Sequence, residues 1–193
     1  MDLYDITRIA KDEIKYILKK VVENNKKDLE ELGRSVEKFE KISESDFPTI
    51  TYTEALKILK EKENMDVEWG KDLRTIEENK LMNHFDTPVV VTNYPLEIMA
   101  FYKPKDPKDP KTALCFDMLA PEEYGEIVGG SQRSTDIEYM KKRLVDMGEN
   151  VKNYEWYFDL RRYGSVPHSG YGVGVERVVA WICGIDNIKD AIP

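Results

Sequence analysis

Most strand-like segments lie in the middle of this chain, where prolines, glycines and aspartates separate them. The β-branched segment Pro88–Thr92 predicts a buried strand, and residues 98–102, 113–119 and 125–128 are further strand candidates. Three prolines lie within residues 103–110, and a proline lacks the amide hydrogen that a strand interior requires. We therefore expect this segment to form the loop of an antiparallel hairpin.

Helix-like segments lie on both sides of the strand-rich region. Apolar side chains within residues 2–32 recur at a spacing close to that of a helix, which predicts an amphipathic helix that ends near Gly33. The hydroxyl group of Thr53 can cap another helix. Further helices are expected over residues 73–85, 136–147, 153–163 and 176–183. The expected order along the chain is helices, then a cluster of strands, then helices. This order predicts an α+β fold with an antiparallel sheet flanked by helices.

Three other segments are expected to be irregular or extended. Residues 34–47 are polar and predict a connection, and residues 47–52 predict a short extended stretch. The glycine-rich residues 170–175 predict an extended run before the last helix. No internal repeat interrupts this order, so we expect a single domain over residues 1–193.

Composition limits the partners that this chain is expected to have. No apolar run approaches the roughly 20 residues that span a bilayer, and the acidic first residues do not resemble a signal peptide, so we expect no membrane association. Lysines and arginines are mixed with acidic residues, and the net charge is −8. Because RNA binding through phosphates usually needs a basic patch, we expect this chain alone to bind RNA weakly.

The cysteines and histidines are too few and too scattered for a zinc site. Cys115 and Cys183 lie far apart in apolar stretches, and the only histidines are His84 and His168. We therefore expect reduced thiols and a cytoplasmic protein.

Alternating glycines precede the last expected helix. Gly170, Gly172 and Gly174 are followed by Glu176 and Arg177. Glycines let a ligand lie against the backbone, and an arginine at a helix start can stack on a purine or meet a phosphate. A tight packing joint between strand and helix explains such glycines about equally well. The spacing does not fit the dinucleotide-binding pattern.

Two carboxylates and an arginine accompany the strand candidates. If residues 113–119 and 125–133 pair as antiparallel strands, Asp117 and Glu126 can face one cleft and suit Mg²⁺ held with substrate phosphates. Arg133 is odd-numbered and Glu126 even-numbered, so a regular strand would place them on opposite faces. A bulge at the two adjacent glycines between them would relieve this conflict. A simple polar strand end explains the pattern equally well.

Several of these segments together resemble the asparaginyl-tRNA synthetases, which are class II aminoacyl-tRNA synthetases. The stretch DLRRYGSVPHSGYGVGVERVVAW, residues 159–181, is similar to the motif 3 region of that family, and APEEYGEIVGGSQR, residues 120–133, is similar to the stretch that precedes it. FPTITYTEALKIL and MDLYDI also resemble the family, so the resemblance covers essentially the whole chain.

The resemblance implies roles for residues that would bind ATP and Mg²⁺. Arg177 resembles the arginine that stacks on adenine, and Gly172 and Gly174 would shape that pocket. Glu126, with Asp117 as its partner, resembles the carboxylate that binds Mg²⁺ and the phosphates of ATP. Arg177 and Glu126 are therefore the expected catalytic residues.

The resemblance also implies an amino-acid pocket. Arg133 resembles the arginine that reads the amino-acid side chain, here the amide oxygen of asparagine, and Gly129 and Gln132 are expected beside it. His168 is expected near the phosphates. The implied chemistry is ATP-dependent formation of asparaginyl adenylate, followed by transfer to tRNA.

The chain also departs from the family pattern. Nothing in it resembles the N-terminal anticodon-binding domain, motif 1 or motif 2, so the resemblance implies the C-terminal half of a catalytic domain. The implied substrates are asparagine and ATP, and the implied macromolecular partners are tRNA and either a complementary N-terminal half or a second copy. We expect little aminoacylation by this chain alone.

Three alternatives stay open at this point. They are an aspartyl-tRNA synthetase, a tRNA-independent paralogue similar to an asparagine synthetase, and a non-catalytic module that binds a nucleotide or a partner. The sequence of residues 165–169 favours the asparaginyl over the aspartyl family.

Overall fold

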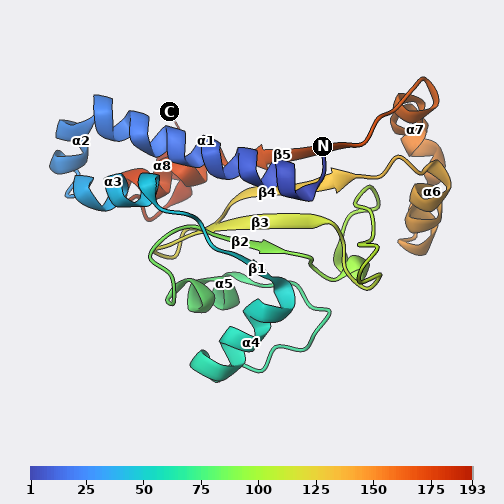
Figure 1. Ribbon diagram of the computed structural model, residues 1–193, viewed down its shortest axis with the longest axis horizontal. Helices are drawn as coiled ribbons and strands as arrows, with labels where there is room; N and C mark the ends of the chain where they lie inside the picture. The colour runs from blue at the N-terminus through green and yellow to red at the C-terminus, as the bar shows by residue number, and fades with distance from the viewer. Residues whose placement is uncertain (193) are drawn as a thin grey trace.

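A computed structural model describes residues 1–192 and shows a five-stranded sheet with helices on both faces (Figure 1). The strands lie in the order β1-β2-β3-β4-β5; β1 is parallel to β2 and the other pairs are antiparallel. Their bounds are Thr49–Thr51, Val89–Thr92, Cys115–Ala120, Gly125–Arg133 and His168–Val173. The α+β fold with a mainly antiparallel sheet is confirmed.

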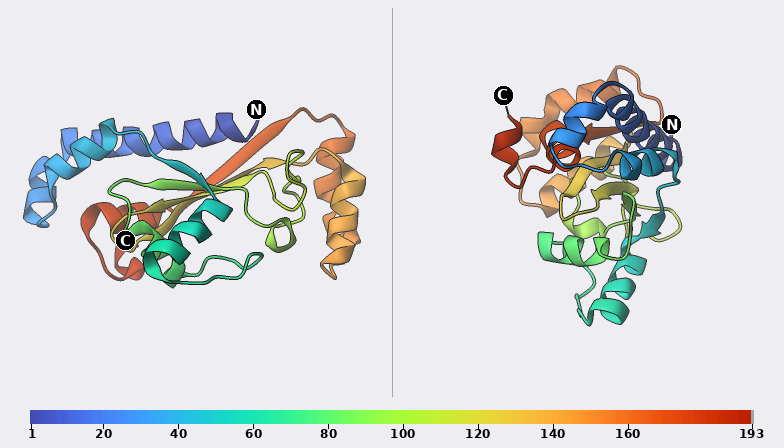
Figure 2. Two further views of the ribbon diagram at one scale, coloured as in Figure 1. Left: turned by 60° about the horizontal axis from the view of Figure 1, so that its bottom comes forward. Right: turned by 90° about the vertical axis from the view of Figure 1, so that its left-hand side faces the viewer.

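One face of the sheet is covered by the two ends of the chain. The helices on this side are α1 (Leu3–Asn24), α2 (Lys26–Glu31), α3 (Val36–Glu44) and α8 (Val175–Cys183) (Figures 1 and 2). Their apolar residues form one core with the even-numbered residues Phe116 and Met118 of β3. Trp181 of α8 is fully buried there and meets the ring of Phe39 edge to face, with 5.9 Å between centroids.

The opposite face is covered by α4 (Tyr52–Glu63) and α5 (Thr75–Met82) (Figure 1). A second core lies between these helices and β2 and β3, and it includes Tyr52, Leu81 and Leu119. Here α4 contacts β1 and β2, and α5 contacts β3 and β4. The remaining parts of β4 and β5 are therefore open on this face.

A small helical unit lies beyond the Arg133 end of β4 (Figure 1). It consists of α6 (Ile137–Asp146), the 3₁₀ turn η2 (Val151–Tyr154) and α7 (Glu155–Arg162), packed around Phe101 and Phe158. Two further 3₁₀ turns, η1 (Leu96–Ile98) and η3 (Ile188–Ala191), complete the regular elements of residues 1–192.

The expected N-terminal helix is present but broken. It ends at Asn24, and α2 begins at Lys26 after a cap at Asn25 with φ −125°. Residues 34–47 do not form an irregular connection, so that prediction is wrong. Ser35 caps α3 by accepting from the amide of Lys38, and the apolar residues of α3 face the core.

Two smaller predictions also need correction. The hydroxyl group of Thr51, not Thr53, caps α4, which begins two residues earlier than expected. Residues 98–102 are not a strand, because the chain turns there after η1. Residues 103–110 do lie in the connection between the antiparallel strands β2 and β3.

Cys115 and Cys183 are both free thiols. Among the helices of residues 1–192, none is long and apolar enough to cross a membrane.

Candidate functional site

The pairing of β3 and β4 brings the two expected carboxylates onto one face. Asp117 pairs with Gly129, and the register shifts next to it, since Met118 pairs with Val128 but Leu119 pairs with Glu126. One residue of β4, Ile127, is therefore extra. This bulge turns Glu126 to the side of Gly129. A bulge is present in β4, but it lies at Ile127 rather than at the two adjacent glycines where the sequence suggested one.

Gly129 shows how closely the two carboxylates approach. A Cβ atom placed on it would lie 2.3 Å from Oε1 of Glu126 and 3.3 Å from Oδ1 of Asp117. Both side chains thus flank the space above this glycine, and glycine is the residue that leaves that space open.

The same face of β5 forms a floor without side chains. Gly172 pairs with Gly129, and Gly170 pairs with Ser131. A Cβ on Gly172 would meet nothing within 4 Å, whereas one on Gly170 would lie 3.2 Å from Nη2 of Arg133. A flat ligand can therefore lie directly on the backbone at Gly172.

Arg177 lies in the first turn of α8, beyond this floor. Its side chain is exposed, and it lines a hollow of about 410 Å³ together with Glu78 and Tyr124. A Cβ on Gly125 would lie 3.5 Å from Nη1 of Arg177 and 2.9 Å from Oε2 of Glu78. The guanidinium and this carboxylate therefore both lie beside the start of β4. A Cβ on Gly174 would reach only ordinary contact with Arg177, at 3.5 Å.

The carboxylates of this face are partly withdrawn from water and repel one another. Burial, and then the charge of Glu126, raises the pKa of Asp117 to about 7, while Lys103 acts in the opposite direction. Burial and then Glu126 also raise the pKa of Glu78 to about 7, against the opposing effect of Arg177. A cation at this site would relieve the repulsion and favour the charged forms.

Arg133 occupies the other end of the same face. Its Nη1 donates to Oγ of Ser131 (2.7 Å), and its Nη2 donates to the carbonyl of Gly170 (3.3 Å). The guanidinium also lies over the ring of Tyr102, 4.7 Å from the centroid. These contacts hold a half-buried, planar set of donors at the edge of the floor.

Two predicted site residues, His168 and Gln132, do not lie near Arg177. His168 pairs with Arg133 across β4 and β5, and its Nδ1 is 2.8 Å from the carbonyl oxygen of Val166. It is therefore at the Arg133 end, away from Arg177. Gln132 alternates with Ser131 and Arg133 along β4, so its side chain faces the opposite side of the sheet.

The arrangement of donors fits Mg²⁺ held jointly by protein and ligand. Within residues 1–192 no group of three histidine, cysteine or acidic side chains is placed to hold a metal ion by itself. Asp117 and Glu126 converge as a pair of hard oxygen donors. Mg²⁺ is commonly bound by one or two carboxylates together with substrate phosphates.

Three residues of the site were not predicted from the sequence. Glu78 reaches it from α5, Lys103 from the proline-rich loop, and Tyr94 from beneath Asp117. The hydroxyl group of Tyr94 is buried and has no hydrogen-bond partner among residues 1–192. Burial, and then Asp117, raises the pKa of Tyr94 well above its usual value. Tyr94 and Lys103 lie between strand candidates and Glu78 lies in an expected helix, and a polar residue at such positions is only a weak signal of a site.

Comparison with known proteins identifies the family to which the chain belongs. The family model described as tRNA synthetases class II (D, K and N) matches residues 1–193. The asparagine–tRNA ligase of Pyrococcus horikoshii is 48% identical over 189 residues, and that of Lactobacillus gasseri is 46% identical over 178 residues. These matches cover 98% and 92% of this chain but only 43% and 41% of the relatives, so the chain spans less than half of their length.

Solved structures match over the same extent. The crystal structure of asparaginyl-tRNA synthetase from Pyrococcus horikoshii complexed with asparaginyl-adenylate is 46% identical and superposes with a TM-score of 0.94. It is covered to 44%, and this chain to 99%. The Entamoeba histolytica asparaginyl-tRNA synthetase in complex with asparaginyl-adenylate is 28% identical, with a TM-score of 0.87 and coverage of 99% of this chain and 43% of that chain.

Proposed function

Because the chain belongs to the class II tRNA synthetases of the D, K and N group, we propose that it carries the adenylate-binding part of a cytoplasmic asparagine–tRNA ligase. The asparagine–tRNA ligases named above favour asparagine as the amino acid. An aspartyl-tRNA synthetase from Entamoeba histolytica is only 24% identical, and that likeness concerns the fold alone.

The observation that carries the proposal is the composition of a single face of the sheet. From one end to the other it presents Arg177, then the carboxylates of Glu126 and Asp117 beside the open glycine floor at Gly172, and then Arg133. These groups suit the successive parts of an aminoacyl adenylate. The guanidinium can stack on the adenine ring, and the carboxylates can hold a metal ion together with phosphates. The donors at the far end can bind the amide of the amino acid.

The nucleotide end binds ATP through stacking and backbone access. Arg177 places its guanidinium on the adenine ring, and Gly172 lets the nucleotide approach the strand without a clash. Gly174 begins the turn into α8 from which Arg177 projects. The carboxylate of Glu78 lies near this guanidinium beside Gly125, and the two charges attract each other.

The middle of the face binds Mg²⁺ with the phosphates of ATP. Glu126 and Asp117 would hold the ion, which when bound neutralises phosphate charge. Both carboxylates are needed in their charged forms for this role, and Lys103 favours the charged form of Asp117. A bound Mg²⁺ would offset the repulsion between these carboxylates, and this would raise the affinity for the metal–nucleotide complex.

The amino-acid end recognises asparagine through Arg133 and Gly129. The guanidinium donates to the amide oxygen of the side chain, and the missing side chain of Gly129 leaves room for the ligand beside the carboxylates. His168 neighbours this end. Gln132 supports the pocket only from the opposite face of β4.

The proposed reaction depends on position and charge rather than on a covalent enzyme intermediate. The carboxylate of asparagine attacks the α-phosphate of ATP, the bond to the β-phosphate breaks, and pyrophosphate leaves with its electron pair. The residues of this face hold the two substrates in line. The adenylate then transfers its aminoacyl group to the 3′-terminal ribose of tRNA, whose binding requires more than this acidic chain.

Calorimetry with Mg²⁺ and ATP, with and without asparagine, tests the proposal directly. We expect binding that Arg177→Ala weakens by about 10- to 100-fold, because a stacked cation contributes roughly 1–3 kcal/mol. We expect Arg133→Ala to weaken the effect of asparagine while leaving ATP binding nearly unchanged.

The control for both variants is Arg8→Ala. Arg8 is an exposed arginine of α1 whose ion pair with Asp12 spans 3.8 Å at the surface. Its loss should change the affinity for neither ATP nor asparagine. Equal weakening by Arg8→Ala and Arg177→Ala would show a general charge effect and would contradict the assignment of the site.

A further inference from the structure

Lys103 lies at the amino-acid end of the proposed site, and hydrogen bonds hold its backbone there. Oη of Tyr139 donates to the carbonyl of Lys103 (2.9 Å), and the amide of Ser134 donates to the carbonyl of Tyr102 (2.9 Å). The ring of Tyr102 lies against the guanidinium of Arg133. Lys103 is therefore fixed beside the residue that is proposed to read the amino-acid side chain.

The side chain of Lys103 reaches the same face of the sheet as the proposed metal ligands. Its Nζ donates to Sδ of Met99 (3.2 Å), and Met99 packs in the core that includes Cys115. Cys115 precedes Asp117 by two residues in β3, so the two side chains point to the same face. The ammonium group therefore lies on the stretch of this face that runs from Arg133 to Asp117.

The charge of Lys103 acts on two neighbouring groups of this face. Burial and then Glu126 raise the pKa of Asp117, and burial raises the pKa of Cys115. The positive charge of Lys103 opposes the rise of the pKa in both groups. These effects agree with the position that the contacts of Lys103 give.

Lys103 has no anionic partner within the described part of the chain. No carboxylate oxygen of residues 1–192 lies within 4.0 Å of its Nζ, although the side chain is half-buried. The thioether sulfur of Met99 is only a weak acceptor. A half-buried ammonium group without a strong acceptor costs stability, and an anionic ligand would supply the missing acceptor.

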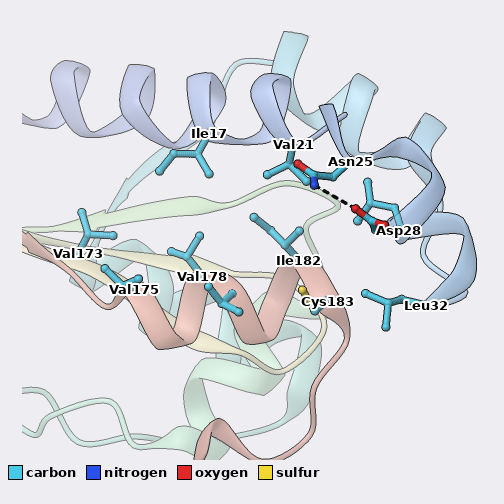
Figure 3. A pocket seen from close by; sticks show the side chains of 12 residues that line it. Ile17, Val21, Asn25, Asp28, Leu32, Val173, Val175, Val178, Ile182 and Cys183 are labelled. Atoms are coloured by element: carbon cyan, nitrogen blue, oxygen red, sulfur yellow. Dashed lines mark hydrogen bonds between the residues drawn. The ribbon is translucent and has the colours of Figure 1, made fainter. Parts of the chain in front are cut away.

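The apolar groove on the α1 face offers no such cation (Figure 3). It lies between α1 and α8 and is lined mainly by aliphatic side chains, including Val178 and Ile182. Among residues 1–192, Asp28 is the only charged one in its lining. The anionic part of a substrate therefore suits the face that carries Lys103 and not this groove.

We propose that Lys103 is a further substrate-binding residue, and that its ammonium group holds the α-carboxylate of the amino acid between Arg133 and the metal site at Asp117. The inference deepens the proposed function and rests on it. Because Arg133 takes the side-chain amide of asparagine, the α-carboxylate needs a second cation. One carboxylate oxygen accepts from Lys103, and the other stays free to attack the α-phosphate of ATP.

Calorimetry with two amino-acid ligands tests this role. Asparagine and its α-amide, which lacks the α-carboxylate, are titrated into the chain with Mg²⁺ and an ATP analogue that cannot be cleaved between its α- and β-phosphates. Lys103→Met keeps a side chain of similar length and removes the charge. We expect it to weaken the binding of asparagine at least about tenfold, and to change the binding of the α-amide by less than about twofold.

Lys108→Met is the matched control, because Lys108 is an exposed lysine of the same loop. It should leave both affinities unchanged. Urea denaturation shows whether each variant folds. Lys103→Met should be at least as stable as the parent chain, since it loses a half-buried charge without a partner. A lower free energy of unfolding would show instead that Lys103 serves the fold, and would overturn the proposal.

Three binding results would also overturn it. Equal weakening of asparagine and its α-amide would show that Lys103 does not meet the carboxylate. Weaker binding of the ATP analogue alone would assign Lys103 to the phosphates. Absence of asparagine binding by the parent chain would remove the ligand of Lys103. In that last case, binding of the ATP analogue that Arg177→Ala weakens would leave the proposed nucleotide site standing, so the two failures are distinguishable.

Discussion

Gly129 and Gly130 are neighbours in β4, yet they are glycines for different reasons. A Cβ on Gly130 would lie 2.4 Å from the ring of Phe116 and 2.8 Å from Cβ of Tyr171, both within the α1 side of the sheet. A Cβ on Gly129 would meet the end of the Glu126 side chain on the opposite face. The first glycine is required by a packed core, the second by the carboxylates of the proposed site.

This contrast extends to the two faces of the sheet as a whole. The α1 face is closed by apolar side chains with fixed positions, as at Trp181. The other face holds partly buried carboxylates, Asp117 and Glu78, whose pKa values lie near 7. Such groups cost stability and are retained where they serve binding or catalysis. Substitutions on the α1 face should therefore mainly lower stability, whereas substitutions on the other face should mainly weaken ligand binding.

The largest expected effect is on the closed face. Trp181→Ala removes a fully buried ring and should lower the free energy of unfolding by about 3–5 kcal/mol, because it leaves a cavity in the core. Trp156→Ala is the control, since Trp156 is 65% exposed on α7. Urea denaturation followed by circular dichroism measures both. Similar losses for the two variants would mean that Trp181 does not anchor this core.

The adjacent glycines Gly129 and Gly130 allow the most direct test of this comparison. Gly130→Ala should lower the free energy of unfolding by about 1–3 kcal/mol, because neither the Phe116 ring nor the backbone of β5 can move freely. Gly129→Ala should have a smaller effect, since the end of a glutamate side chain can turn away. It should instead weaken the binding of ATP with Mg²⁺.

Denaturation and calorimetry on the same two variants test this crossover. If Gly129→Ala proved the more destabilising of the two while leaving nucleotide binding intact, the division between the faces would be wrong.

Several features of the fold were predictable because local pattern and tertiary structure agree. The β-branched strand β2, the proline-rich loop and the helix α8 follow directly from their sequences. The helix α3 was missed because only Val36, Phe39 and Ile42 interrupt a polar segment. Its stability comes from burial of that narrow stripe against α1, which is a tertiary contact.

The site was predictable in part for the same reason. Parity along β4 showed that Glu126 and Arg133 can share a face only if the strand is irregular, but the position of the bulge depends on the register with β3. Glu77 and Glu78 are adjacent and chemically identical, and only the structure distinguishes them. Glu77 pairs with Arg74, whereas Glu78 faces Arg177 across Gly125.

The pH dependence of stability should differ between the carboxylates of the open face and an ordinary ion-paired carboxylate. Because the pKa of Asp117 is raised to about 7 in the folded chain, the folded state binds more protons than the unfolded state between the two pKa values. This contribution is greatest below the unfolded pKa and is lost as pH rises through about 7. Asp117→Asn should therefore reduce the fall in stability between pH 5 and 8 by roughly 1–2 kcal/mol.

Glu77→Gln provides the control with the opposite sign. The hydrogen bond from Arg74 lowers the pKa of Glu77, so its contribution is present above the unfolded pKa and is lost as pH falls. The variant should be destabilised at pH 8 and should converge with the parent chain in acid. Chemical denaturation at several pH values measures both variants, and the same slope for each would contradict the contrast.

The smallest expected effect on stability tests the open floor of the site. A Cβ on Gly172 would meet no atom within 4 Å, so Gly172→Ala should change the free energy of unfolding by less than about 1 kcal/mol, in either direction. The added methyl group would nevertheless occupy the surface on which the nucleotide is proposed to lie. Calorimetry should then show weaker ATP binding, while the melting temperature stays nearly constant. Unchanged binding would mean that the alternating glycines serve the joint between β5 and α8 and that the nucleotide lies elsewhere on this face.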